Sequence, residues 1–104
     1  MSKPILILKQ PNERLEIKIC AISSWGGFDE LIQFLKNEYN AKVLSENDGP
    51  DARRWILESQ NKKIELIHDD MYGNYLIAPT EDSEDIVYEI GKDLEERLKD
   101  DNEE

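Results

Sequence analysis

The chain has 104 residues and a formal net charge of −11, from 24 acidic and 13 basic side chains. A chain of this length builds one hydrophobic core, which excludes a two-domain organisation. Its longest uninterrupted apolar run, Ile5 to Leu8, is far shorter than the roughly 20 residues that span a bilayer. One cysteine and one histidine are too few for an internal disulfide or a structural zinc site, so we expect a cytoplasmic, non-membrane protein without metal or other cofactor.

The first part of the chain predicts two strands joined by a hairpin. Ile5 to Leu8 is expected to form a buried strand, and Gln10 to Glu13 a turn, because Pro11 fixes φ and donates no backbone hydrogen bond. From Leu15 onward apolar and polar residues alternate, which is typical of a half-buried strand. This alternation places Cys20 on the face opposite the apolar row, where a lone thiol is expected to be inert.

A helix is expected from about Phe28 to Tyr39, because apolar residues recur there at helical spacing. The preceding Ser-Ser-Trp-Gly-Gly segment breaks the strand and supplies capping groups. Trp25 is then a loop aromatic, and Asn40 is the expected left-handed residue after the helix.

Four strands are expected next, separated by strong turn signals such as Asn47-Asp48-Gly49-Pro50 and Gln60-Asn61. Connections this short predict an antiparallel meander. The predicted strands are Ala41–Glu46, Arg53–Ser59, Lys62–Asp69 and Asn74–Ala78.

A second helix follows Pro79, capped by Asp82 or Ser83 and carrying an apolar stripe that ends at Leu98. The sequence therefore predicts one α+β domain over residues 1–99 and an acidic, frayed tail over residues 100–104. The predicted element order is β-β-α-β-β-β-β-α, with a single antiparallel sheet of about five to six strands. Both helices are expected on one face, because each has a single apolar stripe, and the opposite face is left partly open for a partner.

The acidity is concentrated at one end of the chain. Residues 81–104 contain twelve acids and three bases, a formal charge of −9, whereas the first eighty residues carry only −2. Such a chain is repelled by nucleic acid and by anionic membranes, and it attracts basic proteins at long range. The alternative is that the charge only maintains solubility.

The densest polar cluster is His68-Asp69-Asp70, which could serve as a general base or as part of a cation site. We favour a structural strand end and turn, because no second histidine and no spaced acidic motif completes a site. No catalytic residue is predicted, the chain is not expected to be an enzyme, and a hydrolase centred on this cluster is the weakest hypothesis. Arg53 and Arg54 beside an aromatic could contact nucleic acid, but in so acidic a chain we expect cross-strand pairs with glutamates.

Small size, strong acidity and an α+β meander without a catalytic set resemble the immunity proteins of bacterial contact-dependent growth inhibition systems. The segment from Ile64 to Ile77, which contains His-Asp-Asp-Met-Tyr-Gly-Asn, is similar to a hairpin of other small bacterial proteins. The resemblance implies an antitoxin-like inhibitor that binds a basic toxin domain, often a nuclease, and blocks its active site or substrate surface.

Candidate partner-binding residues are loop aromatics, turn acids and acids of the second helix. They are Trp25, Asp69, Asp70, Tyr72, Glu84, Asp85 and Glu89. The alternative function is a regulatory or adaptor module that binds a housekeeping protein through the open sheet face. We expect a monomer, with a dimer formed by edge-strand pairing as the alternative.

Overall fold

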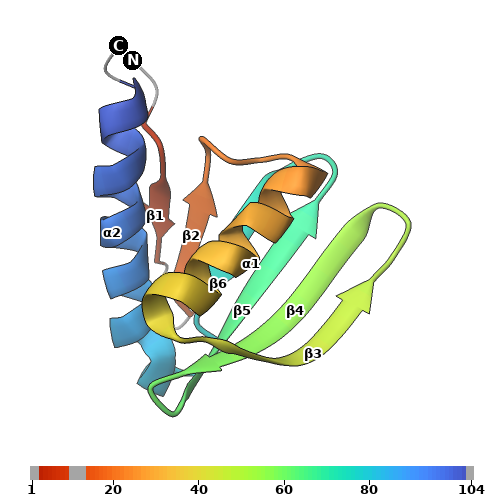
Figure 1. Cartoon of the computed structure of the whole chain (residues 1–104), viewed down its shortest axis with the longest axis vertical. Coiled ribbons are helices and arrows are strands. Elements are labelled where there is room, and N and C mark those ends of the chain that lie inside the picture. Colours follow the sequence, from red (N-terminus) through yellow and green to blue (C-terminus); the bar gives the residue numbers. More distant parts are fainter. Residues whose placement is uncertain (1–2, 10–13, 103–104) are drawn as a thin grey trace.

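The described part of the chain contains six strands and two helices in the predicted order (Figure 1). The computed structural model describes residues 3–9 and 14–102. The strands are β1 (Leu6–Leu8), β2 (Glu16–Ile19), β3 (Lys42–Asp48), β4 (Ala52–Ser59), β5 (Lys62–Asp69) and β6 (Gly73–Ile77). The helices are α1 (Trp25–Tyr39) and α2 (Glu84–Asn102), and the short 3₁₀ turn η1 (Glu81–Ser83) leads into α2. The predicted element order is therefore confirmed.

All six strands form one open antiparallel sheet in the order β1-β2-β6-β5-β4-β3. The two-residue turn between β4 and β5 explains part of this pairing. Gln60 and Asn61 both adopt positive φ, 56° and 64°, which matches the right-handed twist of a tight hairpin. The predicted α+β class with one antiparallel sheet is confirmed.

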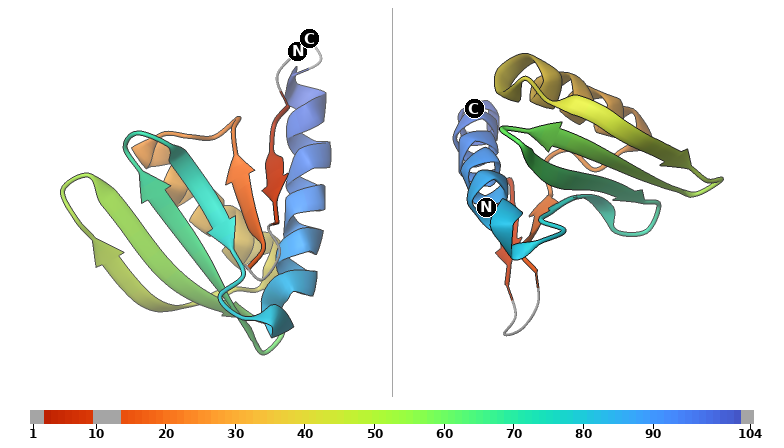
Figure 2. Two further views of the ribbon diagram at one scale, coloured as in Figure 1. Left: turned by 180° about the vertical axis from the view of Figure 1, so that it is seen from behind. Right: turned by 90° about the horizontal axis from the view of Figure 1, so that it is seen from below.

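Both helices pack on the same face of the sheet, as predicted (Figures 1 and 2). Helix α2 approaches β2 closely at Gly91, where an added Cβ would lie 2.2 Å from Cδ1 of Ile17. Apolar residues from the inward side of the sheet and from both helices make one core. Its most deeply buried large side chains include Phe28, Leu31 and Leu35 of α1, Ile90 of α2, and Ile17, Leu57, Ile64, Leu66 and Leu76 of the sheet.

Helix α1 begins three residues earlier than predicted. Ser24 is the N-cap, and its Oγ accepts a hydrogen bond of 2.9 Å from the backbone N–H of Gly27. Gly26 and Gly27 lie inside the helix, and Gly27 lets the helix backbone pack closely against Ile22, since a Cβ on Gly27 would lie 2.5 Å from Cγ2 of Ile22. Trp25 therefore starts the helix rather than standing in a loop. The left-handed residue after the helix is Asn40, with φ of 55°, as predicted.

The first strand is shorter and more exposed than predicted. Only Ile5, which precedes β1, is buried, and the three residues of β1 are each about 40% exposed. The prediction of a buried strand was wrong because β1 lies at an edge of the sheet, where one side has no neighbouring strand. The predicted turn at Gln10 to Glu13 lies outside the described residues.

The opposite edge strand, β3, is irregular. Its pairing with β4 shifts register between Val43 and Ser45, which leaves Leu44 as an extra residue. Leu44 is 45% exposed. Strand β3 also runs to Asp48, so the turn that follows is shorter than the four residues predicted.

Helix α2 extends beyond the predicted domain boundary at Lys99 and reaches Asn102. The helix can continue because residues 99–102 contain neither glycine nor proline. Fraying of the acidic tail stays a prediction, and residues 103–104 lie outside the described part. Neither helix has the length and apolarity that crossing a membrane requires, within residues 3–9 and 14–102.

Candidate interaction surfaces

A buried arginine occupies the end of the sheet beneath the first turns of α1. Arg53 of β4 is only 6% exposed, and its guanidinium carbon lies 4.9, 4.4 and 5.3 Å from the ring centres of Trp25, Phe28 and Trp55. A cation over the negative face of an aromatic ring is attracted to it, most strongly where water is excluded. Arg53 therefore holds the start of α1 onto the sheet.

The charge of Arg53 is matched by two carboxylates. Asp29 lies 3.0 Å and Asp48 3.1 Å from its nitrogens, and the carbonyl of Trp25 accepts a further bond of 3.3 Å. Burial alone would lower the pKa of Arg53, but the hydrogen bonds to Asp29 and Asp48 outweigh it and raise that pKa. Asp48 also accepts a 2.8 Å bond from Trp55 Nε1, and these bonds from Trp55 and Arg53 lower its pKa.

His68 is buried beside this arginine and is braced at both ring nitrogens. Nδ1 lies 2.8 Å from Oδ1 of Asn74, and Nε2 lies 3.3 Å from Oδ1 of Asp70. Asn74 is fully buried, and its Nδ2 donates to the carbonyls of Ile22 and Ser24. The amide orientation fixed by those two bonds makes Nδ1 of His68 the donor to Asn74.

We call Arg53, His68 and Asn74, with their side-chain partners, the end cluster. Asn74 links β6 to the segment before α1, and His68 links β5 to the following turn. No buried side-chain nitrogen or oxygen of the described residues lacks a hydrogen-bond partner. The contacts of His68 are those of a structural histidine, and they support the interpretation of His68-Asp69-Asp70 as a strand end and turn.

The turn between β5 and β6 is held by Asp69, whose Oδ1 accepts from the backbone N–H of Met71 at 2.8 Å and of Tyr72 at 3.2 Å. This Asx-type arrangement gives Asp69 a structural role. The turn leaves Met71 and Tyr72 82% and 57% exposed. A hollow of about 330 Å³ adjoins Tyr72, and Lys18 and Cys20 also line it.

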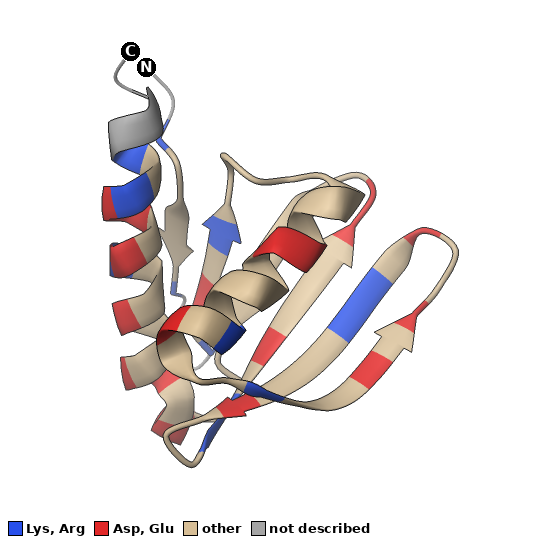
Figure 3. Ribbon diagram, in the orientation of Figure 1, with Lys and Arg blue, Asp and Glu red and all other residues tan. Residues whose placement is uncertain are grey.

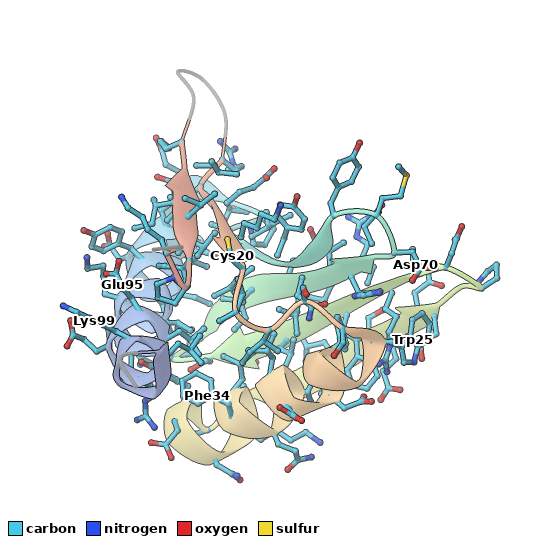
Figure 4. All side chains as sticks on the ribbon, turned by 90° about the horizontal axis from the view of Figure 1, so that it is seen from above. Cys20, Trp25, Phe34, Asp70, Glu95 and Lys99 are labelled. Atoms are coloured by element: carbon cyan, nitrogen blue, oxygen red, sulfur yellow. The ribbon has the colours of Figure 1, made fainter. Side chains whose placement is uncertain are left out.

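Four of the predicted binding residues, Trp25, Asp69, Asp70 and Tyr72, lie at this end of the molecule. The Trp25 ring packs edge to face against the His68 ring, with the ring centres 5.5 Å apart. The carboxylate of Asp70 contacts Nε2 of the same histidine. Figure 4 shows Trp25 and Asp70 on the side of the molecule away from Glu95 and Lys99 of α2. The predicted residues of α2 thus belong to a separate surface.

On α2 the acidic residues divide into paired and unpaired side chains. Glu84 is half-buried and lies 2.6 Å from Lys9, so it is neutralised within the chain. Asp85 and Glu89 are exposed, as are Asp82 in η1 and Glu96. These four acids make no ion pair with any other described residue. We call Asp82, Asp85, Glu89 and Glu96 the acidic row.

The acidic row lies opposite the apolar stripe of α2, since its members recur at intervals of three, four and seven residues. Figure 3 shows acidic segments following one another along the outward side of this helix. Asp82 was not among the predicted binding residues. Because Asp82 precedes Asp85 by about one helical turn, the sequence could have predicted that it lies on the same side as Asp85.

Asp93 of α2 is instead tied to α1. Its carboxylate accepts a 2.7 Å bond from the hydroxyl of Tyr39 and a 2.9 Å bond from Arg97. Burial would raise the pKa of Asp93, but these two hydrogen bonds outweigh it and lower that pKa. Burial and the bond to Asp93 raise the pKa of Tyr39. Asp93 thus joins the two helices.

Among residues 3–9 and 14–102, no group of three or more His, Cys, Asp or Glu side chains has the geometry to hold a metal ion. Neither profiles of known protein families, nor curated protein sequences, nor solved structures give a significant match to this chain.

Proposed function

We propose that this protein binds and neutralises a basic toxin domain, in the manner of an immunity protein, through the acidic row of α2. The observation that supports the proposal is the contrast between paired and unpaired acids on one helix. Glu84, Asp93 and Glu95 form ion pairs within the chain, whereas no member of the acidic row forms one with another described residue. Surface carboxylates that form no ion pair within the chain can attract a basic partner protein.

The dimensions of the acidic row suit a nuclease. The row runs from Asp82 in η1 to Glu96 in α2, and the fourteen steps between them correspond to about 21 Å at a helical rise of 1.5 Å per residue. A nuclease carries a basic surface that contacts successive phosphates of its substrate. A row of carboxylates along a rigid helix can occupy that surface, and attraction between the two charges speeds capture of the toxin.

The proposal is tested by co-expression with the C-terminal domain of any large toxin that is encoded next to this protein, with cell survival and association rate as the measurements. The row variant Asp85→Asn/Glu89→Gln/Glu96→Gln is expected to associate about tenfold more slowly at low salt. Its matched control, Glu30→Gln/Glu46→Gln/Asp51→Asn, removes the same charge from exposed sites elsewhere and is expected to change the rate less than about threefold.

The same rates measured at high salt show whether the effect is electrostatic, because screening should make the association rates of the row variant and of the natural chain nearly equal. Equal slowing in the control would show that net charge acts without any specific row. No protection and no binding by the natural chain would overturn the proposal.

The adaptor function was predicted to use the open sheet face, but a different surface supports it, the exposed apolar tip formed by Met71 and Tyr72. Exposed aromatic and methionine side chains often anchor protein partners. In cells without any toxin, a housekeeping partner captured by the natural chain and lost with Met71→Ser/Tyr72→Ser would favour this alternative. The row variant serves as its control, because it leaves the tip intact.

A further inference from the structure

The face of the sheet opposite the helices has an ordered arrangement of side chains. Within the described residues no helix covers it, as the left view of Figure 2 shows. Residues on this face alternate along each strand with the buried core residues. The strand registers align them into two neighbouring rows that run across five strands. One row is Leu6, Lys18, Tyr75, Ile67 and Arg54, and the other is Leu8, Glu16, Ile77, Glu65 and Ile56.

Both cations of these rows lie in one row and both acids in the other. We therefore call the row with Lys18 and Arg54 the cationic row and the row with Glu16 and Glu65 the anionic row. Lys18 lies over the Tyr75 ring at 5.9 Å, and Arg54 pairs with Glu65 at 2.8 Å. The two rows together are neutral, although the chain carries −11.

The remaining members of both rows are large and apolar, and none is fully buried. Leu6 and Leu8 are 41% and 39% exposed, and Tyr75, Ile77, Ile67 and Ile56 are half-buried. A sheet face with this many partly exposed apolar side chains is typical of a contact surface. We propose that its occupant is a second copy of this chain, so that two sheets pack face to face in a symmetric dimer.

The charge order of the rows selects this occupant. A twofold axis that runs across the strands, between the two rows, places the cationic row of one copy over the anionic row of the other. Lys18 then faces Glu16 of the second copy, and Glu16 faces its Lys18. Tyr75 faces Ile77 and Leu6 faces Leu8 in the same way, so the apolar contacts of β6 and β1 are also complementary. On β5 and β4 the axis places Ile67 over Glu65 and Arg54 over Ile56, so within the two rows opposite charges face one another directly at β2. Sheets packed at the usual spacing of about 10 Å bring such side chains into contact.

The net charge supports the same choice. Two chains that each carry −11 repel one another over most of their surfaces, and most strongly at the acidic row. On the neutral sheet face they meet without net repulsion. The acidic row lies on the helix side of the molecule, so this dimer leaves it open. The inference therefore goes beyond the proposed function and does not depend on it.

The test is sedimentation of the full chain from about 1 μM to about 1 mM, which covers weak and moderate dimers. We expect a concentration-dependent dimer. Lys18→Glu places an acid over Glu16 of the second copy and is expected to weaken the dimer at least tenfold. The control Lys36→Glu makes the same charge change on the outward side of α1 and is expected to weaken it less than about threefold.

A second variant separates a lost interface from a damaged fold. Glu16→Lys/Lys18→Glu exchanges the two charges on β2, so opposite charges again face one another across the same axis. It is expected to restore the dimer to within about threefold of the natural chain. Far-ultraviolet circular dichroism would check that each variant keeps its secondary structure.

Four outcomes would overturn the proposal. The first is a monomer throughout the concentration range. The second is equal weakening of the dimer by Lys18→Glu and Lys36→Glu, and the third is no rescue by the charge exchange. The fourth is a monomer that loses toxin binding with Lys18→Glu, which would assign the sheet face to the toxin.

Discussion

The end cluster and the acidic row use charge in opposite ways. In the end cluster a cation is removed from water and surrounded by rings and carboxylates, so its interactions serve the fold. The acids of the acidic row remain in water without an ion pair to another described residue, so they add little to stability and keep their charge for another molecule. Mutation of the buried charge is therefore expected to lower stability, and mutation of the exposed acids is expected to weaken binding to a partner.

The strongest way to break this contrast is to remove the buried cation. Arg53→Met is expected to lower the free energy of unfolding by about 3 kcal/mol, because it removes the cation from three aromatic rings together with its hydrogen bonds to Asp29 and Asp48. Urea unfolding is the measurement. Lys63→Met on the neighbouring strand β5 is the control, because this side chain is exposed and makes no ion pair with another described residue, and the change should cost less than about 1 kcal/mol. Equal losses would show that Arg53 gains nothing from its burial.

A smaller effect is expected at the amide that joins β6 to the start of α1. Asn74→Ala leaves His68 Nδ1 and the carbonyl of Ile22 without these partners and removes one of two donors to the carbonyl of Ser24, which should cost about 2 kcal/mol. Asn47→Ala on edge strand β3, where the side chain is exposed, is the control and should change stability by less than about 0.5 kcal/mol. If hydrogen exchange at the start of α1 stayed unchanged in Asn74→Ala, the bracing role would be refuted.

The smallest effect sharpens the contrast within α2 itself, where Asp93 is the acid tied to α1. Because the folded state lowers the pKa of Asp93, its stabilising contribution is present above about pH 4 and is lost as the pH falls through the lowered value. Asp93→Asn should therefore reduce the decline of stability on acidification. Arg97→Gln, which removes one of the two donors, should reduce it partly. The prediction would be contradicted if the free energy of unfolding fell with decreasing pH in both variants as steeply as in the natural chain.

Most of the fold could be predicted because its signals are local. Hairpin turns such as Gln60-Asn61 fix which strands are neighbours, and the apolar stripes of both helices fix the face they cover. The exposure of β1 could not be predicted, because it depends on the position of the strand at an edge of the sheet. The early start of α1 was missed because Gly26 and Gly27 were interpreted as a break.

The candidate site was predicted less completely. Arg54 pairs with Glu65 across strands as expected, but Arg53 turns to the opposite face. Alternation along β4 places Arg53 on the same side as Trp55 and Leu57, so the signal was in the sequence. The ring of aromatics that makes this burial favourable comes partly from α1. Only the tertiary structure brings Trp25 and Phe28 over that end of the sheet.

The irregular pairing at Leu44 has a consequence for how copies of this chain can associate. A regular edge strand offers a template on which identical chains add one after another without limit, as in amyloid. The extra residue in β3 interrupts its spacing of backbone donors and acceptors, and the acids at its end repel a like strand. Growth along the β3 edge is therefore disfavoured, and the association proposed for the sheet face would stop at two copies because both faces are then used. The bulge thus favours a finite assembly over a fibre.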